Sequence, residues 1–334
     1  MPKSHRLQLQ TIADWDNVAW AMGRACRGKR RNPAVVGMLA RADEAIGAIS
    51  AALGVGHLPV GHLRAFEIHD PKRRLIHAAP LADRVAHHAL VRHLEPTLER
   101  ALLPSVFACR VGKGVHAAIH HAQRQARRFP WVMHLDIAHY FPNIDHATLR
   151  AQLRRRFRGD GLGLIDSVID AHQGAEGRGL PIGALTSQHF ANHYLNLADR
   201  WLLAQPEVRA HCRYMDDFLV WSDDKVALKA LRDRFIAFLA DELVLAAKPP
   251  LIQRSEQGVL FCGIHIKPRS LRASQRRRRR FRHSLDHWQG EWLAGRIGDL
   301  ALQRAHDSAR AILLPADDRI WRKQCVNLGG HFDV

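Results

Sequence analysis

Two adjacent carboxylates stand between apolar β-forming residues in this chain. Asp216 and Asp217 lie in the segment Arg213-Tyr-Met-Asp-Asp-Phe-Leu-Val-Trp221. Apolar, strand-forming residues on both sides of a short polar pair predict a β-hairpin with the acids at its tip. Carboxylate oxygens at such a tip are hard ligands, which suit Mg²⁺. For an isolated Asp-Asp pair, the alternative is a turn without chemistry.

A third carboxylate has the same setting upstream. Asp136 ends the apolar segment that begins at Trp131, so a buried type of strand is expected to finish on an acid. Three acids on two strand ends are what two-metal phosphoryl transfer needs, because ions about 3.5–4 Å apart stabilise the attacking and leaving oxygens. This interpretation requires Asp136 to lie beside the corner formed by Asp216 and Asp217.

The composition indicates a polyanionic partner. The 334 residues include 50 Lys and Arg against 32 Asp and Glu, a formal charge of +18. Nucleic acid is the commonest partner of such a chain, and a basic surface tuned for solubility is the alternative. A hydrophobic content of 47% allows a large core divided into two or three subdomains.

Cysteine and hydropathy patterns restrict the class of protein further. The five cysteines contain no CxxC pair, which argues against a zinc ribbon or a disulfide framework and fits a reducing cytoplasm. The 23 histidines show no ligand spacing with cysteine and are interpreted as ordinary polar residues. There is no apolar run of about 18 residues and no leader pattern, so we expect a cytoplasmic protein without a membrane partner.

The elements that must position the acids follow from periodicity and turn residues. Helices and strands are mixed without strict alternation, which favours the α+β class. The expected elements are helices over 15–26 and 33–53, a basic hairpin over 64–77, a helix over 81–103, a helix ending near 128, a strand over 131–136, helices over 145–157 and 186–204, the acidic hairpin around 214, a helix over 225–240, a strand over 258–266, and a basic, mainly helical region over 271–334.

Six short motifs occur in an order that identifies a family. They are Pro71-Lys-Arg-Arg-Leu-Ile76 with Pro80-Leu-Ala-Asp-Arg-Val85 and Leu94-Glu-Pro96, then Ser105-Val-Phe-Ala-Cys-Arg-Val-Gly-Lys-Gly114, Asp136-Ile-Ala-His-Tyr-Phe141-Pro, Leu180-Pro-Ile-Gly-Ala-Leu-Thr-Ser-Gln188, Tyr214-Met-Asp-Asp217, and Gly258 to Gly263. In this order the chain resembles the reverse transcriptases of bacterial retroelements, from about residue 66 to about residue 266. The fourth motif points to diversity-generating retroelements, because Ile182 replaces the usual Gln and Gln188 the usual Pro.

The resemblance implies a right-hand polymerase architecture with fingers, a palm that contains an antiparallel sheet, and a small helical thumb. The expected divisions are an N-terminal helical extension (1–60), fingers (61–130), a palm with inserted fingers helices (131–268) and a basic thumb (269–334). The region after about residue 270 matches the family weakly. No separate nuclease module is recognisable, and from the length we expect no maturase or endonuclease domain.

The resemblance also assigns roles to residues. The catalytic acids are Asp136, Asp216 and Asp217, and two Mg²⁺ ions, with Mn²⁺ as an acceptable substitute, are held by Asp136, Ile137, Asp216 and Asp217. The nucleotide-binding set is Lys72, Arg74, Arg110, Phe141, Ile182, Gly183 and Lys248. The primer and template set is Tyr214, Met215, Gln188, Gly263, Arg276, Arg277, Arg278, Arg279 and Arg280.

Several of these roles have a physical rationale. The ring of Phe141 is expected to exclude a 2′-hydroxyl and so to select dNTPs. Lys248 is expected to protonate the departing pyrophosphate. Ile182 cannot donate the hydrogen bond of the amide that it replaces, a contact that contributes on the order of 1 kcal/mol, so we expect low fidelity. The resemblance implies that the expected errors occur mainly opposite template adenines.

The partners implied by the resemblance are a structured template RNA, the RNA/cDNA duplex, dNTPs and a small basic oligomeric accessory protein. Two alternatives remain open: a related bacterial reverse transcriptase in antiphage defence, and a catalytically silent RNA-binding protein with a polymerase fold.

Overall fold

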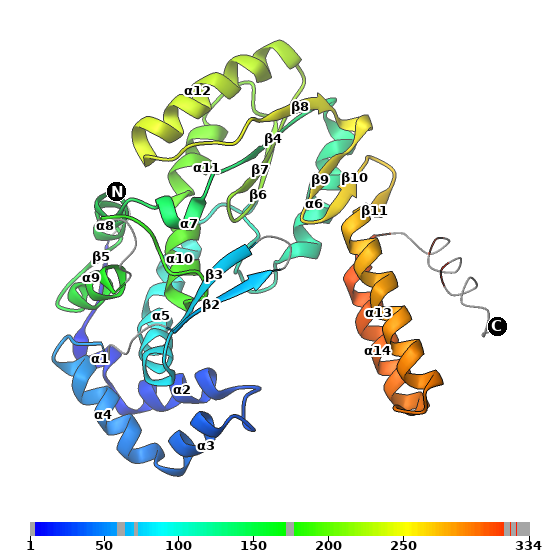
Figure 1. The fold of residues 1–334 in the computed structure, drawn as a ribbon. Helices are drawn as coiled ribbons and strands as arrows, with labels where there is room; N and C mark the ends of the chain where they lie inside the picture. Colours follow the sequence, from blue (N-terminus) through cyan, green and yellow to red (C-terminus); the bar gives the residue numbers. More distant parts are fainter. Residues whose placement is uncertain are drawn as a thin grey trace. The chain divides into compact units, whose positions relative to one another are not determined.

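Helices and strands are mixed along the chain, which confirms the predicted α+β class (Figure 1). The computed structural model describes residues 4–58, 64–69, 73–171, 177–316, 321 and 325. They form two compact units, one from 1–104, 137–201 and 236–247, the other from 105–136, 202–235 and 248–334. Because both units are discontinuous, they cut across the boundaries expected from the sequence. The division into fingers, palm and thumb stays a prediction.

The first unit begins with a group of helices. They are α1 (Leu9–Ile12), α2 (Trp15–Cys26), α3 (Pro33–Ala40) and α4 (Ala42–Gly54), with a short strand β1 (His5–Arg6) before them. The carboxylate of Asp14 caps α2 by accepting from the backbone amides of Asp16 and Asn17. The helix expected over 33–53 is interrupted at Arg41, whose backbone leaves the helical region. Helix α5 (Leu81–Ala101) packs against α2 with Val85 and Leu94 fully buried.

The rest of the first unit holds the hairpin β2 (Arg64–His69) and β3 (Arg73–Ala78) and a further set of helices. The helices are α7 (Tyr140–Asn143), α8 (His146–Arg154), α9 (Leu162–Asp170), α10 (Leu185–Tyr194) and most of α11 (Asn196–Leu203), and the strand β5 (Phe157–Arg158) pairs with β1. The helix expected over 186–204 is therefore two helices.

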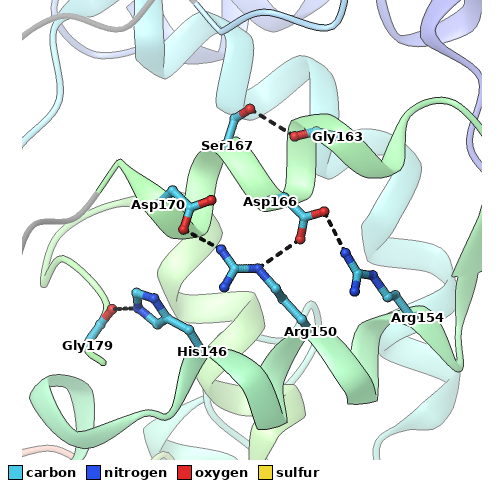
Figure 2. Close-up of polar contacts among 8 residues, drawn as sticks. All are labelled: His146, Arg150, Arg154, Gly163, Asp166, Ser167, Asp170 and Gly179. Atoms are coloured by element: carbon cyan, nitrogen blue, oxygen red, sulfur yellow. Dashed lines mark hydrogen bonds and ion pairs between the residues drawn. The ribbon is translucent and has the colours of Figure 1, made fainter. Parts of the chain in front are cut away.

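Ion pairs fasten α8 to α9 (Figure 2). The guanidinium of Arg150 contacts the carboxylates of Asp166 (Nε to Oδ1, 3.0 Å) and Asp170, and Arg154 reaches Asp166 at 3.0 Å. At the start of α8, the ring of His146 lies 2.7 Å from the carbonyl of Gly179. The segment that leads into the Leu180–Gln188 motif is thereby tied to a helix that is itself braced.

The second unit is built on a four-stranded antiparallel sheet. Its strands are β4 (Trp131–Asp136), β6 (Ala210–Tyr214), β7 (Asp217–Ser222) and β8 (Leu251–Arg254), in the order β6-β7-β4-β8. Helix α6 (Val115–Arg128) packs on this sheet, and Ile119 and Ala122 lie in one core cluster with Val132, Leu219 and Trp221. The two central strands, β4 and β7, are thus fixed by a buried core.

A second, three-stranded sheet and a helix pair complete this unit. The expected strand over 258–266 is a hairpin, β9 (Val259–Phe261) and β10 (Ile264–Ile266), and β11 (Leu271–Ala273) pairs with β10. Helices α13 (Gln275–Leu293) and α14 (Asp299–Leu313) lie side by side (Figure 1). Helix α12 (Lys225–Leu243) belongs to both units, and a 3₁₀ turn (Ser255–Gln257) follows β8. Over the described residues, every helix is too short or too polar to cross a membrane.

Candidate active site

The paired acids lie at the tip of the β6–β7 hairpin. Tyr214 pairs with Asp217, so Met215 and Asp216 form the turn, and Met215 takes a left-handed φ of 56°. The buried guanidinium of Arg213 donates to the carbonyl of Met215 at 3.0 Å. This contact from a buried side chain fixes the backbone next to Asp216. It was not predicted from the sequence.

The sheet places Asp136 directly opposite Asp217. These two residues are register partners in the antiparallel pair of β4 and β7. Side chains of such partners emerge on one face with their Cβ atoms about 4.5–5.5 Å apart. Asp216 is the neighbour of Asp217 in the turn. The structure therefore places Asp136 opposite Asp217, with Asp216 next to Asp217 along the chain.

The acids influence one another electrostatically. Burial, together with the charges of Asp136 and Asp217, raises the pKa of Asp216 to about 6. The ammonium of Lys248 lies 2.7 Å from Oδ1 of Asp136, and the backbone amide of Lys248 donates to the carbonyl of Asp136 at 2.8 Å. Apart from this ammonium, the buried Oδ1 atom of Asp136 has no polar partner in the described part of the chain.

These donors suit magnesium. A carboxylate oxygen whose one polar partner is an ammonium, together with the carboxylates of Asp216 and Asp217, offers hard anionic donors. Among the described residues, no three His, Cys, Asp or Glu side chains are grouped so that together they could hold a metal ion. Mg²⁺ in phosphoryl-transfer sites is usually held by one or two carboxylates, with substrate phosphates and waters as the other ligands. Asp136, Asp216 and Asp217 are therefore the residues that would hold it.

His134 is a member of the site that sequence reasoning missed. Its Nε2 lies 2.6 Å from Oδ1 of Asp217. Burial lowers the pKa of His134, but the hydrogen bond to Asp217 and the charges of Asp217 and Asp136 outweigh this effect and raise it. The available signal was its position two residues before Asp136, since alternate residues of a strand share a face.

The loop that carries Arg110 is attached to the same sheet. Val106 forms a bridge with Arg213, and the amide of Phe107 donates to the carbonyl of Arg213 at 3.0 Å. Arg110 donates to the carbonyl of Val106 at 2.9 Å, which anchors its guanidinium within the loop. Of the other two expected phosphate-binding cations, Lys72 lies outside the described residues, and Arg74 is placed only as part of β3.

The Leu180–Gln188 motif is braced by the β2–β3 hairpin of the first unit. The amide of His77 donates to the carbonyl of Ile182 at 2.9 Å. Gly183 has a φ of 112°, and a Cβ there would lie 3.1 Å from the side chain of Ile76. The side chain of Ile182 is half-buried, and Gln188 lies in the first turns of α10, also half-buried.

Phe141 and its neighbour differ in exposure. Tyr140 is buried and its hydroxyl donates to the carbonyl of Ala191, whereas the ring of Phe141 is half-buried and packs edge-on against Tyr140. Only Phe141 of these two aromatics therefore has a face available to a ligand. Ile137, one residue after Asp136, is fully buried and its backbone forms a bridge with Ala247.

The residues expected to bind primer and template differ in their surroundings. Tyr214 and Met215 are half-buried beside the acids. Arg276, Arg279 and Arg280 are exposed on α13, and Arg278 lies over the ring of Trp321 at 5.0 Å. Arg277 instead donates to the carbonyls of Cys262, Ile312 and Leu314.

Gly263 leaves room for the side chain of Arg277 to reach the carbonyl of Cys262. It has a φ of 76°, and a Cβ there would lie 2.6 Å from Nε of Arg277. The glycine therefore leaves the space through which Arg277 joins the β9–β10 turn to the end of α14.

The sequence pattern of the reverse transcriptase (RNA-dependent DNA polymerase) family matches residues 69–263, more than half of the chain. The chain belongs to this family, and the reverse-transcriptase class predicted from the motifs is confirmed. Protein YkfC of Escherichia coli strain K12 is 25% identical over 239 residues, which cover 58% of this chain and 62% of YkfC.

Solved structures of telomerase are similar in fold, but loosely. Apo telomerase from Candida tropicalis gives a TM-score of 0.48 at 12% identity, covering 64% of this chain and 48% of the telomerase. Telomerase from Candida albicans in complex with a fragment of telomeric RNA gives 0.46 at 12% identity, covering 70% of this chain and 50% of that chain. The chain spans less than two thirds of the length of these relatives.

Proposed function

We propose that this protein is an RNA-directed DNA polymerase that copies a structured RNA into cDNA. The observation that carries the proposal is the register pairing of Asp136 with Asp217 beside Asp216, in a chain whose reverse-transcriptase motifs occur in family order. Two magnesium ions bound there would neutralise charge on the triphosphate and activate the primer hydroxyl. Asp136 and Asp216 are the ligands in this proposal, and Asp217 assists.

The protein residues position the reactants around that chemistry. His134 fixes the carboxylate of Asp217 through its 2.6 Å contact, so that carboxylate has one preferred orientation. Arg213 holds the turn that carries Asp216. Lys248, already beside Asp136, is the proposed donor of a proton to the departing pyrophosphate. Arg110 is the proposed phosphate contact, together with Lys72 and Arg74.

We further propose that the enzyme belongs to a diversity-generating retroelement and is error-prone at template adenines. The support is Ile182, an aliphatic residue at the position where the resemblance of the Leu180–Gln188 motif to the family leads us to expect an amide. Losing one neutral hydrogen bond of about 1 kcal/mol reduces discrimination between nucleotides by roughly fivefold. The proposed partners are template RNA, the RNA/cDNA duplex, dNTPs and a small basic accessory protein.

The test is primer extension on an adenine-rich RNA template with Mg²⁺ and dNTPs, followed by sequencing of the cDNA. Extension by the native chain, absent in Asp216→Asn, supports the polymerase, and an excess of errors at adenines supports the subtype. No extension by folded native protein, in Mg²⁺ or Mn²⁺, would reject the polymerase. Equal error rates at all four template bases would reject the subtype alone.

A further inference from the structure

A basic cavity lies at the end of the four-stranded sheet away from the acids. It has a volume of about 970 Å³ and lies between the end of α6, the 3₁₀ turn after β8, and the turn that joins β10 to β11. Trp131 begins β4 and pairs with Arg254 at the end of β8, whereas Asp136 ends β4. At about 3.3 Å per residue, this end of β4 is about 17 Å from Asp136. The cavity is therefore separate from the proposed catalytic centre.

Positive charge dominates the lining of this cavity. It contains five exposed cations and one acid, Glu256; the cations are Arg127, Arg128, Arg254, Lys267 and Arg269. Elsewhere in the chain arginines such as Arg150 and Arg234 pair with carboxylates. None of the five cations forms an ion pair with any residue in the described part of the chain. Like charges gathered around a hollow repel one another and concentrate positive potential there.

Backbone contacts fix the guanidinium of Arg127 and the turn that carries Lys267 and Arg269. Nε of Arg127 donates to the carbonyl of Pro268 at 2.6 Å, and Nε2 of Gln123 donates to the carbonyl of Lys267 at 3.3 Å. The turn that carries Lys267 and Arg269 is therefore fastened to α6. A cation on a fixed backbone loses less conformational entropy on binding an anion than one on a flexible segment does.

One aromatic ring, that of Phe129, lines the cavity. The ring of Trp131 does not line it, but its centre lies 5.1 Å from the guanidinium of Arg254, which does. Arg128 lies 5.2 Å from the ring centre of Phe129. Basic grooves that contain aromatic rings are characteristic of surfaces for single-stranded nucleic acid, where cations contact phosphates and planar groups stack on bases.

We propose that this cavity binds the sugar-phosphate backbone of RNA as a second contact, remote from the site of nucleotide addition. A strand presents phosphates at regular intervals, so several cations around one hollow can each take a phosphate, and arginine can do so through two donors. The inference deepens the proposed function, because the RNA concerned would be a part of the template molecule outside the primer duplex.

The test measures RNA binding by the full chain without dNTPs, using a fluorescently labelled unstructured RNA across a series of salt concentrations. The variant is the triple substitution Arg128→Gln, Arg254→Gln and Arg269→Gln. We expect its affinity to fall at least tenfold, and the slope of log affinity against log salt to shrink by about 2, since each lost contact with a single strand contributes about 0.7. The matched control removes equal charge from the exposed turn after α2, through Lys29→Gln, Arg30→Gln and Arg31→Gln, and should lose less than threefold.

A second measurement uses the native protein, so it does not depend on the folding of the variant. Photocrosslinking of 4-thiouridine RNA, mapped to peptides, should label 126–131 or 251–256. Crosslinks confined to α13, or equal affinities of the triple variant and its control, would overturn the proposal. Because no nucleotide is added, a failed polymerase assay with a positive binding result would reject the proposed function and leave this site standing. Normal primer extension combined with a negative binding result would reject only this site.

Discussion

The ammonium of Lys248 and the carboxylate of Asp136 form a 2.7 Å ion pair inside the proposed metal site. The lysine side chain stands at the oxygen that a magnesium ion would use, and both side chains are partly exposed to solvent. A metal ion bound at the proposed site would therefore compete with Lys248 for this carboxylate. This competition connects the residue proposed to donate a proton with the residues proposed to hold metal.

Replacing Lys248 by Met should separate these two effects. Without the ammonium, the Mg²⁺ concentration that gives half of the thermal stabilisation should fall several-fold, because Asp136 loses a competing cation. At saturating Mg²⁺ the rate of nucleotide addition should fall by about 10²–10⁴, the usual contribution of a positioned acid. Thermal shift and single-turnover extension measure the two quantities. Lys229→Met, an exposed lysine on α12, is the control; unchanged Mg²⁺ dependence in Lys248→Met would contradict the prediction.

The acid corner should make the metal-free protein less stable at neutral pH. The pKa of Asp216 is raised to about 6 in the folded state, above its ordinary value of 3.8. The native state thus favours the protonated form, so this residue reduces stability progressively as pH rises from about 4 to about 6. The loss is at most about 3 kcal/mol, because one pKa unit corresponds to about 1.4 kcal/mol.

Asp216→Asn should remove this penalty. Denaturant unfolding in EDTA should show the variant gaining on the native protein from pH 4.5 to pH 6 and keeping that gain at pH 8. The variant should nevertheless fail to extend a primer. A variant that is less stable than native protein at pH 8 would contradict the electrostatic account of this corner.

Features that depend on neighbouring residues could be predicted from the sequence, whereas features that depend on contacts between distant residues could not. The hairpin tip at Asp216 followed from local alternation around a two-residue turn. His134 and Arg213 were missed because their partners lie across strands, and local patterns do not define such pairings. The strand expected over 258–266 failed because Cys262 and Gly263 form a turn, with φ values of 49° and 76°, inside an apolar run. Continuous periodicity also concealed the break at Arg41 between α3 and α4.

Phe141 and Tyr140 give a matched pair for sugar selection. Phe141→Ala should admit ribonucleotides with an efficiency at least tenfold higher relative to dNTPs, because a half-buried ring would no longer oppose the 2′-hydroxyl. Tyr140→Phe removes only the hydroxyl that donates to Ala191, so it should lower stability by about 1 kcal/mol without changing sugar choice. Competitive incorporation of rNTPs and dNTPs measures the ratio. Equal selectivity in Phe141→Ala and native protein would remove the assignment.

Ile182→Gln should improve fidelity if the missing amide causes the errors. The backbone carbonyl of Ile182 is already held by His77, so the substitution changes the side chain without releasing the segment. We expect the error rate at template adenines to fall by about fivefold, the equivalent of one recovered hydrogen bond. Ile182→Leu keeps the apolar character and serves as the control. If both variants show the native error spectrum in sequenced cDNA, the side chain at this position does not set fidelity.

Arg277 and Arg279 should behave differently although they lie two residues apart on α13. Arg277→Ala leaves the carbonyls of Cys262, Ile312 and Leu314 without their donor, so unfolding free energy should fall by about 2–3 kcal/mol. Arg279 is exposed, and Arg279→Ala should leave stability within about 0.5 kcal/mol while weakening affinity for a template–primer duplex about threefold. Thermal unfolding and duplex titration distinguish the two. Equal losses of stability would mean that the carbonyl contacts of Arg277 do not stabilise the packing of the β9–β10 turn against α14.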